Sequence, residues 1–439
     1  MKIDSLVKNL EKTTAEQDKI MQEQAQSVTK QHLASYNALL RSSKNETEQA
    51  LAENINLIKQ SKSSIQKALA YKTMLGGLMG ALLTTLGHVQ NVVERRNTIP
   101  ILSNVLISAE DGKITLVATD LDIEVSESAE ATIDAPGSIT APAHTLYDIA
   151  RKLPDGAQVS LKVNNDDRLD VDAGRSHFTL PLLPSGDFPK MTADGFTHNF
   201  VVSTAELRRL IDKTKFAIST EETRYYLNGI YVHAHDGVLR AVATDGHRLA
   251  LSEMALPAGA EGLPGVIIPR KTVAEIRRLV DGADGEVSLS VSDAKIRFHY
   301  GDAVLTSKLI DGTFPDYDRV IPKTNEKQLV LDNKVFADAV DRVATISAEK
   351  SRSIKLTLSQ DNLALVVDNP ESGNAREDLV VDYSFDELEI GFNAKYLLDV
   401  ASQIEGRDAT FLLDSPASPA LVKDSEDPGS LFVLMPLRV

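Results

Sequence analysis

Few residues of this chain have the types and spacing that chemistry at a site requires. His247 lies in "TDGHR" (244–248), and "NDD" (165–167) places three oxygen-bearing side chains in a row. A histidine can act as a general base, but no nucleophile at a recognisable motif accompanies His247, which favours a structural or cleft-lining role. The "NDD" segment could bind a cation, but it separates "KVN" from the alternating "RLDVD", which favours a hairpin turn.

The chain also lacks the motifs of phosphate and zinc chemistry. Neither G-x-x-x-x-G-K-[ST] nor H-E-x-x-H occurs, and none of the 439 residues is cysteine. Disulfides and thiolate catalysis are therefore excluded, in keeping with a cytoplasmic protein. The apolar part of "MLGGLMGALLTTLG" (74–87) is shorter than the about 20 residues that cross a bilayer, and no signal peptide is visible. We expect no catalytic site, metal, cofactor or membrane contact.

The composition divides the chain near residue 73. Its net charge is -16, but residues 1–72 carry 11 Lys and Arg against 8 Asp and Glu, a balance of +3. The remainder therefore carries -19, and all 24 glycines and 17 prolines lie from Gly76 onward. Apolar residues recur at helical spacing in residues 1–73, which predicts a helical or coiled-coil extension. Because this apolar stripe is thin and interrupted, a partly disordered helix is the alternative. This segment also weakly resembles the helical N-terminal part of plasmid mobilisation accessory proteins.

From residue 82 onward the chain repeats itself three times. The segment "ILSNVLISAEDGKITLVATD" (101–120) matches "YLNGIYVHAHDGVLRAVATD" (226–245) and, more loosely, "SIKLTLSQDNLALVVDN" (353–369). Each copy reads as two strands joined by a two-residue turn, "DG" or "DN". Two amphipathic helices accompany each copy, which predicts an α+β fold of repeated domains with much antiparallel sheet.

Basic residues concentrate on the predicted helices of this acidic body. If the helices share one surface, that surface is far more positive than the net charge indicates. The alternative, which charge alone favours, is that these are solvated helix faces paired with nearby acids. The residues are Arg151, Lys152, Arg208, Arg209, Lys213, Lys215, Arg270, Lys271, Arg277, Arg278, Arg342 and Lys395.

Six stretches, in order, give the chain from about residue 82 to 439 a specific resemblance. It resembles the β subunit of bacterial DNA polymerase III, the sliding clamp. The stretches are "VVERRNTIPILSNVL" (92–106), "RYYLNGI" (224–230), "VATDGHRLAL" (242–251), "LTSKLIDGTFPDYDRVIPK" (305–323), "IGFNAKYLLDV" (390–400) and "VLMPLRV" (433–439).

The resemblance implies three clamp domains, with helices inside and antiparallel sheets outside. We place the extension at 1–73 and the domains at 74–195, 196–322 and 323–439. Two copies are expected to close head to tail into a ring that encircles double-stranded DNA without reading its sequence. Expected partners are the polymerase III catalytic subunit, the clamp loader, and other polymerases and repair proteins that carry clamp-binding peptides. The alternative is a scaffold directed by the coiled coil, which uses the clamp body only as a docking platform.

The resemblance also implies sites, residue by residue. A hydrophobic peptide-binding cleft is expected at Leu227, Thr244, Gly246, His247, Arg248, Leu249, Phe314, Pro315, Arg319, Val320, Val433, Leu434, Met435, Pro436, Leu437 and Arg438. DNA contacts are expected at Arg96, Tyr225, Arg270 and Lys271, whereas the acidic Glu221 puts the contact of its loop in doubt. The dimer interface is expected to pair Phe178 and Leu180 of one copy with Thr345 and Ile346 of the other.

The front of the first domain departs from the family pattern. Clamps begin with an alternating strand before the first helix, but "TMLGGLMGA" (73–81) has three glycines in five residues and no alternation. We therefore expect the first strand to be replaced and one sheet edge of domain 1 to be weakened.

Overall fold

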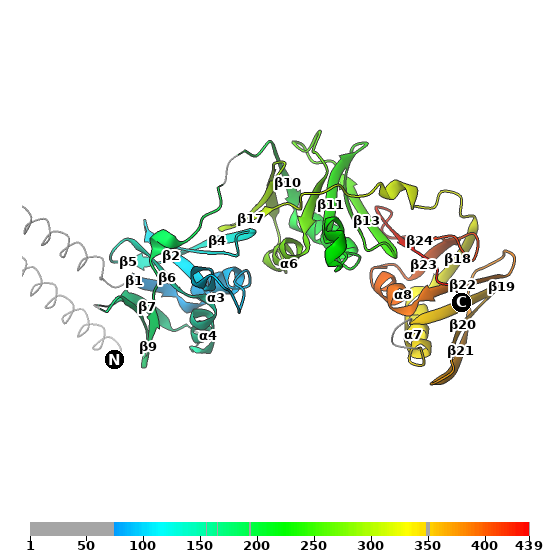
Figure 1. Cartoon of the computed structure of the whole chain (residues 1–439), viewed down its shortest axis with the longest axis horizontal. Coiled ribbons are helices and arrows are strands. Elements are labelled where there is room, and N and C mark those ends of the chain that lie inside the picture. Colours follow the sequence, from blue (N-terminus) through cyan, green and yellow to red (C-terminus); the bar gives the residue numbers. More distant parts are fainter. Residues whose placement is uncertain (1–73, 155, 165, 193–194, 348–351, 439) are drawn as a thin grey trace, which may run out of the picture.

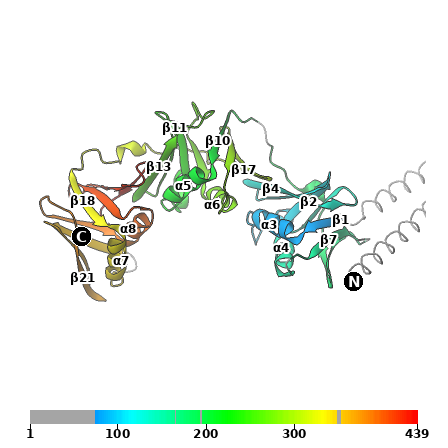
Figure 2. The same cartoon turned by 180° about the vertical axis from the view of Figure 1, so that it is seen from behind.

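The computed structural model describes residues 74–438, except 155, 165, 193–194 and 348–351. The expected helical extension, residues 1–73, lies outside the described residues. The described part forms an arch of three similar domains (Figure 1), and the view from behind shows the same succession (Figure 2). No helix within it is long and apolar enough to span a membrane.

Domain 1 surrounds two helices with strands of two sheets. Helix α3 (Met79–Val89) packs on α4 (Ala143–Lys152) and on strands β3 and β4. Its strands are β1 (Met74–Leu78), β2 (Asn104–Glu110), β3 (Lys113–Thr119), β4 (Ile123–Glu130), β5 (Thr132–Ile133), β6 (Gly137–Pro142), β7 (Gln158–Val163), β8 (Arg168–Ala173) and β9 (Ser176–Pro181), with short 3-10 helices η1 (Pro100–Ser103) and η2 (Ser185–Asp187).

Domain 2 repeats this plan. Helix α5 (Thr204–Lys215) begins with a capping box, in which Ser203 and Glu206 satisfy each other's backbone N–H groups. It packs on α6 (Arg270–Leu279). The strands are β10 (His198–Ser203), β11 (Gly229–His235), β12 (Val238–Thr244), β13 (Arg248–Ala255), β14 (Val266–Pro269), β15 (Glu286–Val291), β16 (Lys295–Tyr300) and β17 (Ala303–Lys308), with 3-10 helices η3 (Glu222–Leu227) and η4 (Tyr317–Arg319).

Domain 3 completes the series. Helices α7 (Asn333–Ala344) and α8 (Ala394–Ala401) begin at the side-chain caps Asp332 and Asn393. The strands are β18 (Lys327–Asp332), β19 (Ser353–Ser359), β20 (Asn362–Asn369), β21 (Gly373–Val380), β22 (Leu388–Asn393), β23 (Asp408–Leu413), β24 (Ala420–Asp424) and β25 (Ser430–Leu434).

The sheets run across the domain boundaries. The fourth strand of domain 1 and of domain 2 pairs antiparallel with the last strand of the next domain: β4 with β17, and β13 with β25. Two eight-stranded sheets result, β10-β15-β16-β17-β4-β3-β2-β6 and β14-β11-β12-β13-β25-β24-β23-β18. Smaller sheets, β5-β1-β7-β8-β9 and β21-β20-β19-β22, stand at the two ends of the arch. The strands β9 and β21 are therefore free edges.

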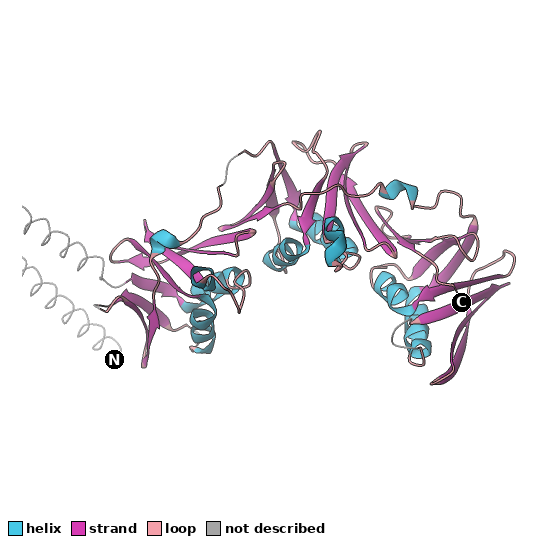
Figure 3. Ribbon diagram, in the orientation of Figure 1, coloured by secondary structure: helices cyan, strands magenta, loops and turns pink. Residues whose placement is uncertain are grey.

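All described α-helices lie on the concave side of the arch, and the sheets form its convex side (Figure 3). This arrangement confirms the predicted α+β clamp architecture. Alternate residues of each strand point to opposite faces, so one face of each sheet packs on helices and the other points away from them.

The repeated hairpins form where the sequence predicts them, with one difference. Asp111–Gly112 and Asp236–Gly237 join their strands with positive φ at both residues, as a two-residue turn of this kind requires. In the third repeat Ser359 pairs with Asn362, so the turn is Gln360–Asp361 rather than "DN". Asp361 takes the second turn position, where φ is +57°.

The expectation that domain 1 lacks its first strand is wrong. Residues Met74–Leu78 form β1, which pairs with β5 on one side and β7 on the other. Backbone hydrogen bonds to two neighbours do not require side-chain alternation, and the register shift between Leu75 and Leu78 accommodates the intervening Gly76 and Gly77. Strand β1 is also not an edge, because β5 covers it.

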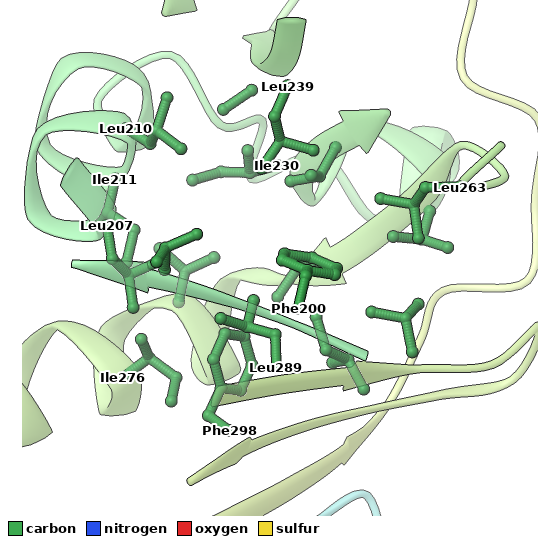
Figure 4. A pocket seen from close by; sticks show the side chains of 18 residues that line it. Phe200, Leu207, Leu210, Ile211, Ile230, Leu239, Leu263, Ile276, Leu289 and Phe298 are labelled. Carbon is green, nitrogen blue, oxygen red and sulfur yellow. The ribbon is translucent and has the colours of Figure 1, made fainter. Parts of the chain in front are cut away.

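The core of domain 2 encloses a small apolar cavity of about 40 Å³ between α5, α6 and the strands on either side (Figure 4). Phe200, Leu210, Ile230, Leu289 and Phe298 are among its lining residues, all of which are apolar. A cavity of this kind offers no polar partner to water or to a polar ligand. It is therefore a packing gap of the core and not a candidate site.

We predict that His88 makes domain 1 less stable as the pH rises. The hydrogen bond from His88 Nδ1 to Glu127 Oε2, 2.6 Å, ties α3 to β4 and raises the pKa of His88 above its ordinary value of 6.5. Stability from this pair is full below that value and is lost as the pH passes the raised pKa. Thermal unfolding of the protein and of a His88→Gln variant should show the variant losing less stability between about pH 6 and pH 8. Parallel pH profiles would contradict the assignment.

Candidate functional site at the junction of domains 2 and 3

An apolar cluster lies on the face of the second large sheet that points away from the helices. Leu249 and Val433 occupy paired positions on β13 and β25, and both belong to this cluster, whereas their neighbours Ala250 and Phe432 belong to the main core. We call this group the outer cluster; its buried members are Leu227, Val242, Leu249, Leu251, Ile267, Phe314, Tyr317, Leu421 and Val433.

The segment that connects domains 2 and 3 covers part of the outer cluster. Phe314 stacks flat on Tyr231, with ring centroids 4.8 Å apart and planes 4° apart. Tyr317 Oη lies 2.8 Å from His233 Nε2, which holds the connector on β11. Four residues of the predicted cleft, Leu227, Leu249, Phe314 and Val433, are thus brought together.

Exposed apolar side chains flank the outer cluster. Val320 on the connector is 44% exposed and Met435 in the C-terminal tail is 38% exposed, so both present apolar surface to solvent beside the cluster. Met435 N donates to His247 O at 2.9 Å, and Leu437 N donates to Gly391 O at 2.8 Å. The tail is therefore fixed to domain 2 at one point and to domain 3 at the next.

The other predicted cleft residues fall into two groups. Gly246, His247, Pro315, Arg319 and Arg438 are exposed, and Pro436 and Leu437 are half-buried. Leu434 lies in the main core, because it points to the opposite face of β25 from Val433. Thr244 is buried and donates its hydroxyl to Arg248 O at 2.7 Å.

Arg248 is buried at the boundary of domains 2 and 3. Its guanidinium pairs with Asp245 at 3.2 Å and with Asp399 of α8, and it donates to Phe216 O at 2.6 Å. The same group lies over the rings of Tyr396, at 4.5 Å, and Phe216, at 5.1 Å. Arg248 therefore joins the domains beneath the site rather than presenting a free cation to a ligand.

A polar pocket of about 500 Å³ opens where α5 ends and where α6 and α8 begin. Arg270 and Lys395 line it, and neither has a carboxylate within ion-pair distance in the described part of the chain. Its lining residues are Lys215, Phe216, Ile218, Ser219, Thr220, Glu221, Asp245, His247, Arg248, Arg270, Lys395, Tyr396 and Asp399. Sequence reasoning did not assign Tyr396 and Asp399 to this site, although both lie in the matching stretch "IGFNAKYLLDV".

The residues predicted to contact DNA differ in exposure and in whether other residues already bind them. Arg96 and Arg270 are exposed, and Tyr225 is 53% exposed. Lys271 instead bridges two domains: its Nζ donates to Val92 O at 3.1 Å and pairs with Asp120.

The acidic loop residue Glu221 is also engaged within its own loop. Its carboxylate accepts two hydrogen bonds from Arg224, at 2.8 and 2.6 Å, and this contact lowers the pKa of Glu221. The two charges of this pair cancel each other, so Arg224 offers no free charge to a phosphate, and the exposed Glu222 leaves the loop acidic.

Several cations of the predicted helices serve as ties between elements. Lys213, 3% exposed, donates to Gln403 O and pairs with Glu405 at 2.9 Å. Arg209 pairs with Asp427 at 3.2 Å, and Arg277 pairs with Asp212 at 2.9 Å. For these residues the alternative interpretation holds, because neighbouring carboxylates and carbonyl groups bind their charged groups.

The predicted interface residues lie at the two ends of the arch. Phe178 and Leu180 are on the free edge strand β9, with Phe178 half-buried and Leu180 only 7% exposed. Thr345 is the C-cap of α7, and Ile346 follows it.

Residues of the "NDD" segment lie in the turn between β7 and β8, where Asn164 Oδ1 accepts from Asp166 N at 3.0 Å. This confirms the hairpin interpretation, and the described residues contain no group that could hold a metal ion.

Three tandem domains, each with two concave-side helices and sheets shared with its neighbours, define a clamp-type protein. Models of the DNA polymerase III beta subunit match the chain in three parts: the N-terminal domain at 79–192, the central domain at 201–316 and the C-terminal domain at 318–438. The chain belongs to the family of bacterial DNA polymerase III beta subunits, the beta sliding clamps.

The match covers nearly the whole length of known relatives. The beta sliding clamp of Caulobacter vibrioides is 63% identical over 364 residues, covering 82% of this chain and 98% of that protein. The clamp of Escherichia coli K12 is 39% identical over 361 residues, with the same coverage. Proteins of this kind are non-catalytic, so the expectation that the chain is not an enzyme is confirmed.

Solved clamp structures have the same architecture. A crystal structure of the Caulobacter crescentus clamp, with PEG bound to a putative beta-motif tethering region, has a TM-score of 0.82 and 62% identity, covering 84% of this chain and all of that one. A Bartonella birtlesii clamp bound to griselimycin has a TM-score of 0.81 and 50% identity, with the same coverage.

We predict that Arg248→Gln lowers the stability of the protein by about 3 kcal/mol, because it leaves the carboxylates of Asp245 and Asp399 without their cation. Arg319→Gln provides a matched control: Arg319 is an exposed arginine, paired only with Asp316, and its loss should cost under about 1 kcal/mol. Urea unfolding of both variants checks the difference. Equal midpoints would show that Arg248 does not join the domains.

Proposed function

We propose that this chain works as a DNA sliding clamp, in which two copies close head to tail around duplex DNA and hold a replicative polymerase on it. The observation that carries the proposal is the arch itself, which has helices along its concave side and a free sheet edge at each end. Two such arches meet at two end-to-end junctions. A head-to-tail contact closes into a ring when the rotation between the copies permits.

Contacts with DNA are proposed to come from the exposed cations of the concave side. Arg96 and Arg270 have no acidic partner among the described residues, and the exposed ring of Tyr225 adds a further contact. Contacts with phosphates carry no sequence information. A ring held by a few such contacts remains on DNA by topology and is free to slide.

The outer cluster is proposed as the docking site for partner peptides. Apolar anchors of a peptide would pack against Val320 and Met435, which flank the buried floor of Leu249 and Val433. Met435 can adapt its shape to different sequences because its side chain is unbranched. The partners we propose are the polymerase III catalytic subunit, the clamp loader, and other polymerases and repair proteins. A protein with these partners is expected in the cytoplasm, with the nucleoid.

The alternative function, a scaffold directed by the N-terminal segment, is not favoured. The family models match residues 79–192, 201–316 and 318–438, and these ranges hold every described α-helix and nearly all of the strands. A clamp body used only as a platform gives no role to the free cations of the concave side.

Retention on circular DNA tests the proposed ring. We expect the full chain, once loaded by a clamp loader, to stay on circular primed DNA and to leave when the circle is cut. A variant without residues 1–73 should behave the same way. Release that does not depend on linearisation would overturn the ring, and loss of retention in the shortened variant would support the scaffold.

Deletion of residues 435–439 tests the docking site. The tail contributes the exposed Met435 and the backbone bonds to His247 and Gly391, so we expect at least about a tenfold loss of affinity for a polymerase-derived peptide. The ring should remain intact by sedimentation. Val335→Asp, a change at an exposed apolar residue of α7, serves as the control and should leave peptide binding unchanged. Unchanged affinity after the deletion would exclude the tail from the site.

A further inference from the structure

The two internal junctions show how a third junction must be built. At each one, the strand after the second hairpin strand of a repeat pairs with the last strand of the next domain. Strand β21 is the equivalent strand of domain 3, and β9 is the last strand of domain 1. Both lack a neighbour on one side within the described structure. A second copy of this chain supplies the missing neighbour for each.

The strand pairing within each hairpin identifies the residues of different domains that are equivalent. Glu130 and Val380 each pair with the first residue of the preceding strand, Lys113 and Asn362, so β4 and β21 align without a gap. Ser176 and Ala303 each follow a two-residue turn, which aligns β9 with β17 in the same way.

The first internal junction then sets the register of the third. Ala303 faces Glu127 and Leu305 faces Val125 at that junction. By equivalence, Ser176 faces Glu377 of the next copy, and Phe178 faces Ala375. On the opposite face of the sheet, His177 faces Arg376.

The outer face of β8 and β9 is acidic in this row. His177 Nδ1 lies 2.6 Å from Asp172 Oδ1, and its Nε2 lies 3.9 Å from Asp170 Oδ1. In the described part of the chain, His177 is the only basic group within ion-pair distance of either aspartate. The hydrogen bond with Asp172 raises the pKa of His177, as expected where negative charge dominates.

The outer face of β21 places one cation, Arg376, at the matching position of this row. Arg376 is 60% exposed and, within one copy, pairs with Asp378 at 2.7 Å. Neighbouring strands lie about 4.8 Å apart, so Arg376 and Asp172 of the next copy are two strand spacings apart, about 10 Å between Cα atoms. An extended arginine spans this distance above His177. Asp378 comes opposite Arg175, which reinforces the same register.

We infer that Arg376 of one copy binds Asp172 and Asp170 of the next, and that this ionic row fixes the register and makes a second copy of this chain the preferred occupant of the edge. The inference rests on the proposed ring. Because a head-to-tail dimer has two identical junctions, the row occurs twice, and each charge change acts twice.

Two charge-reversal variants test the inference, because each change acts at both junctions of the dimer. Arg376→Glu and Asp172→Arg each place like charges at both junctions, so each variant alone should dissociate at about tenfold higher concentration in sedimentation velocity. Mixed in equal amounts, the two variants should form a dimer about as tight as the unaltered protein, because both junctions of the mixed ring are again complementary. The double variant in one chain should behave like the mixture, and about 0.5 M salt should shrink all these differences.

Further variants and measurements distinguish a failure of the ionic row from a failure of the ring. Lys334→Glu, a charge reversal on the exposed face of α7, should leave dimerisation unchanged. Thermal unfolding of each variant shows whether it folds. A mixture no tighter than the single variants would overturn the ionic row while leaving the ring in place. A monomeric unaltered protein would instead overturn the ring itself.

Discussion

Backbone hydrogen bonding between edge strands is the interaction on which this structure depends. Each domain presents an unpaired strand at two edges, and an exposed edge is a template for further pairing. Six strands occupy the junction positions of the three domains, and four of them are paired within the chain, β4 with β17 and β13 with β25, which leaves the edges of β9 and β21. The curvature of the arch, the single concave face for the helices and the two remaining edges all follow from repeating one junction.

Several cations of this protein bind acidic or carbonyl groups of a neighbouring domain. Lys213 and Arg248 join domain 2 to domain 3, and Lys271 joins domain 2 to domain 1. In the described part of the chain, Arg96, Arg270 and Lys395 have no carboxylate within ion-pair distance and are available to phosphate. An acidic protein with a few free inner cations suits weak, mobile contact with DNA, because every additional phosphate contact strengthens binding.

Local pattern predicted most of the fold. Alternation and the "DG" turns located the hairpins, and amphipathic spacing located the helices, because these signals depend on neighbours in the sequence. The strand at Met74–Leu78 was missed because its pairing with β7 and β5 is tertiary and overrides the weak propensity of glycine. The partners of Lys213 and Arg209 were missed for the same reason, since Glu405 and Asp427 lie far along the chain. The roles of Tyr396 and Asp399 likewise depend on how α8 meets β13, which no local pattern encodes.

Strand β25 pairs with β13, about 180 residues earlier in the sequence, and supplies Val433 to the outer cluster. Contacts between residues so far apart in the sequence form late in folding, and during synthesis they wait until the later strand has emerged from the ribosome. Until β25 pairs with β13, the outer cluster lacks Val433. A complete outer cluster therefore reports that domains 2 and 3 have both folded and joined, so any peptide that needs this surface would distinguish joined from unjoined domains.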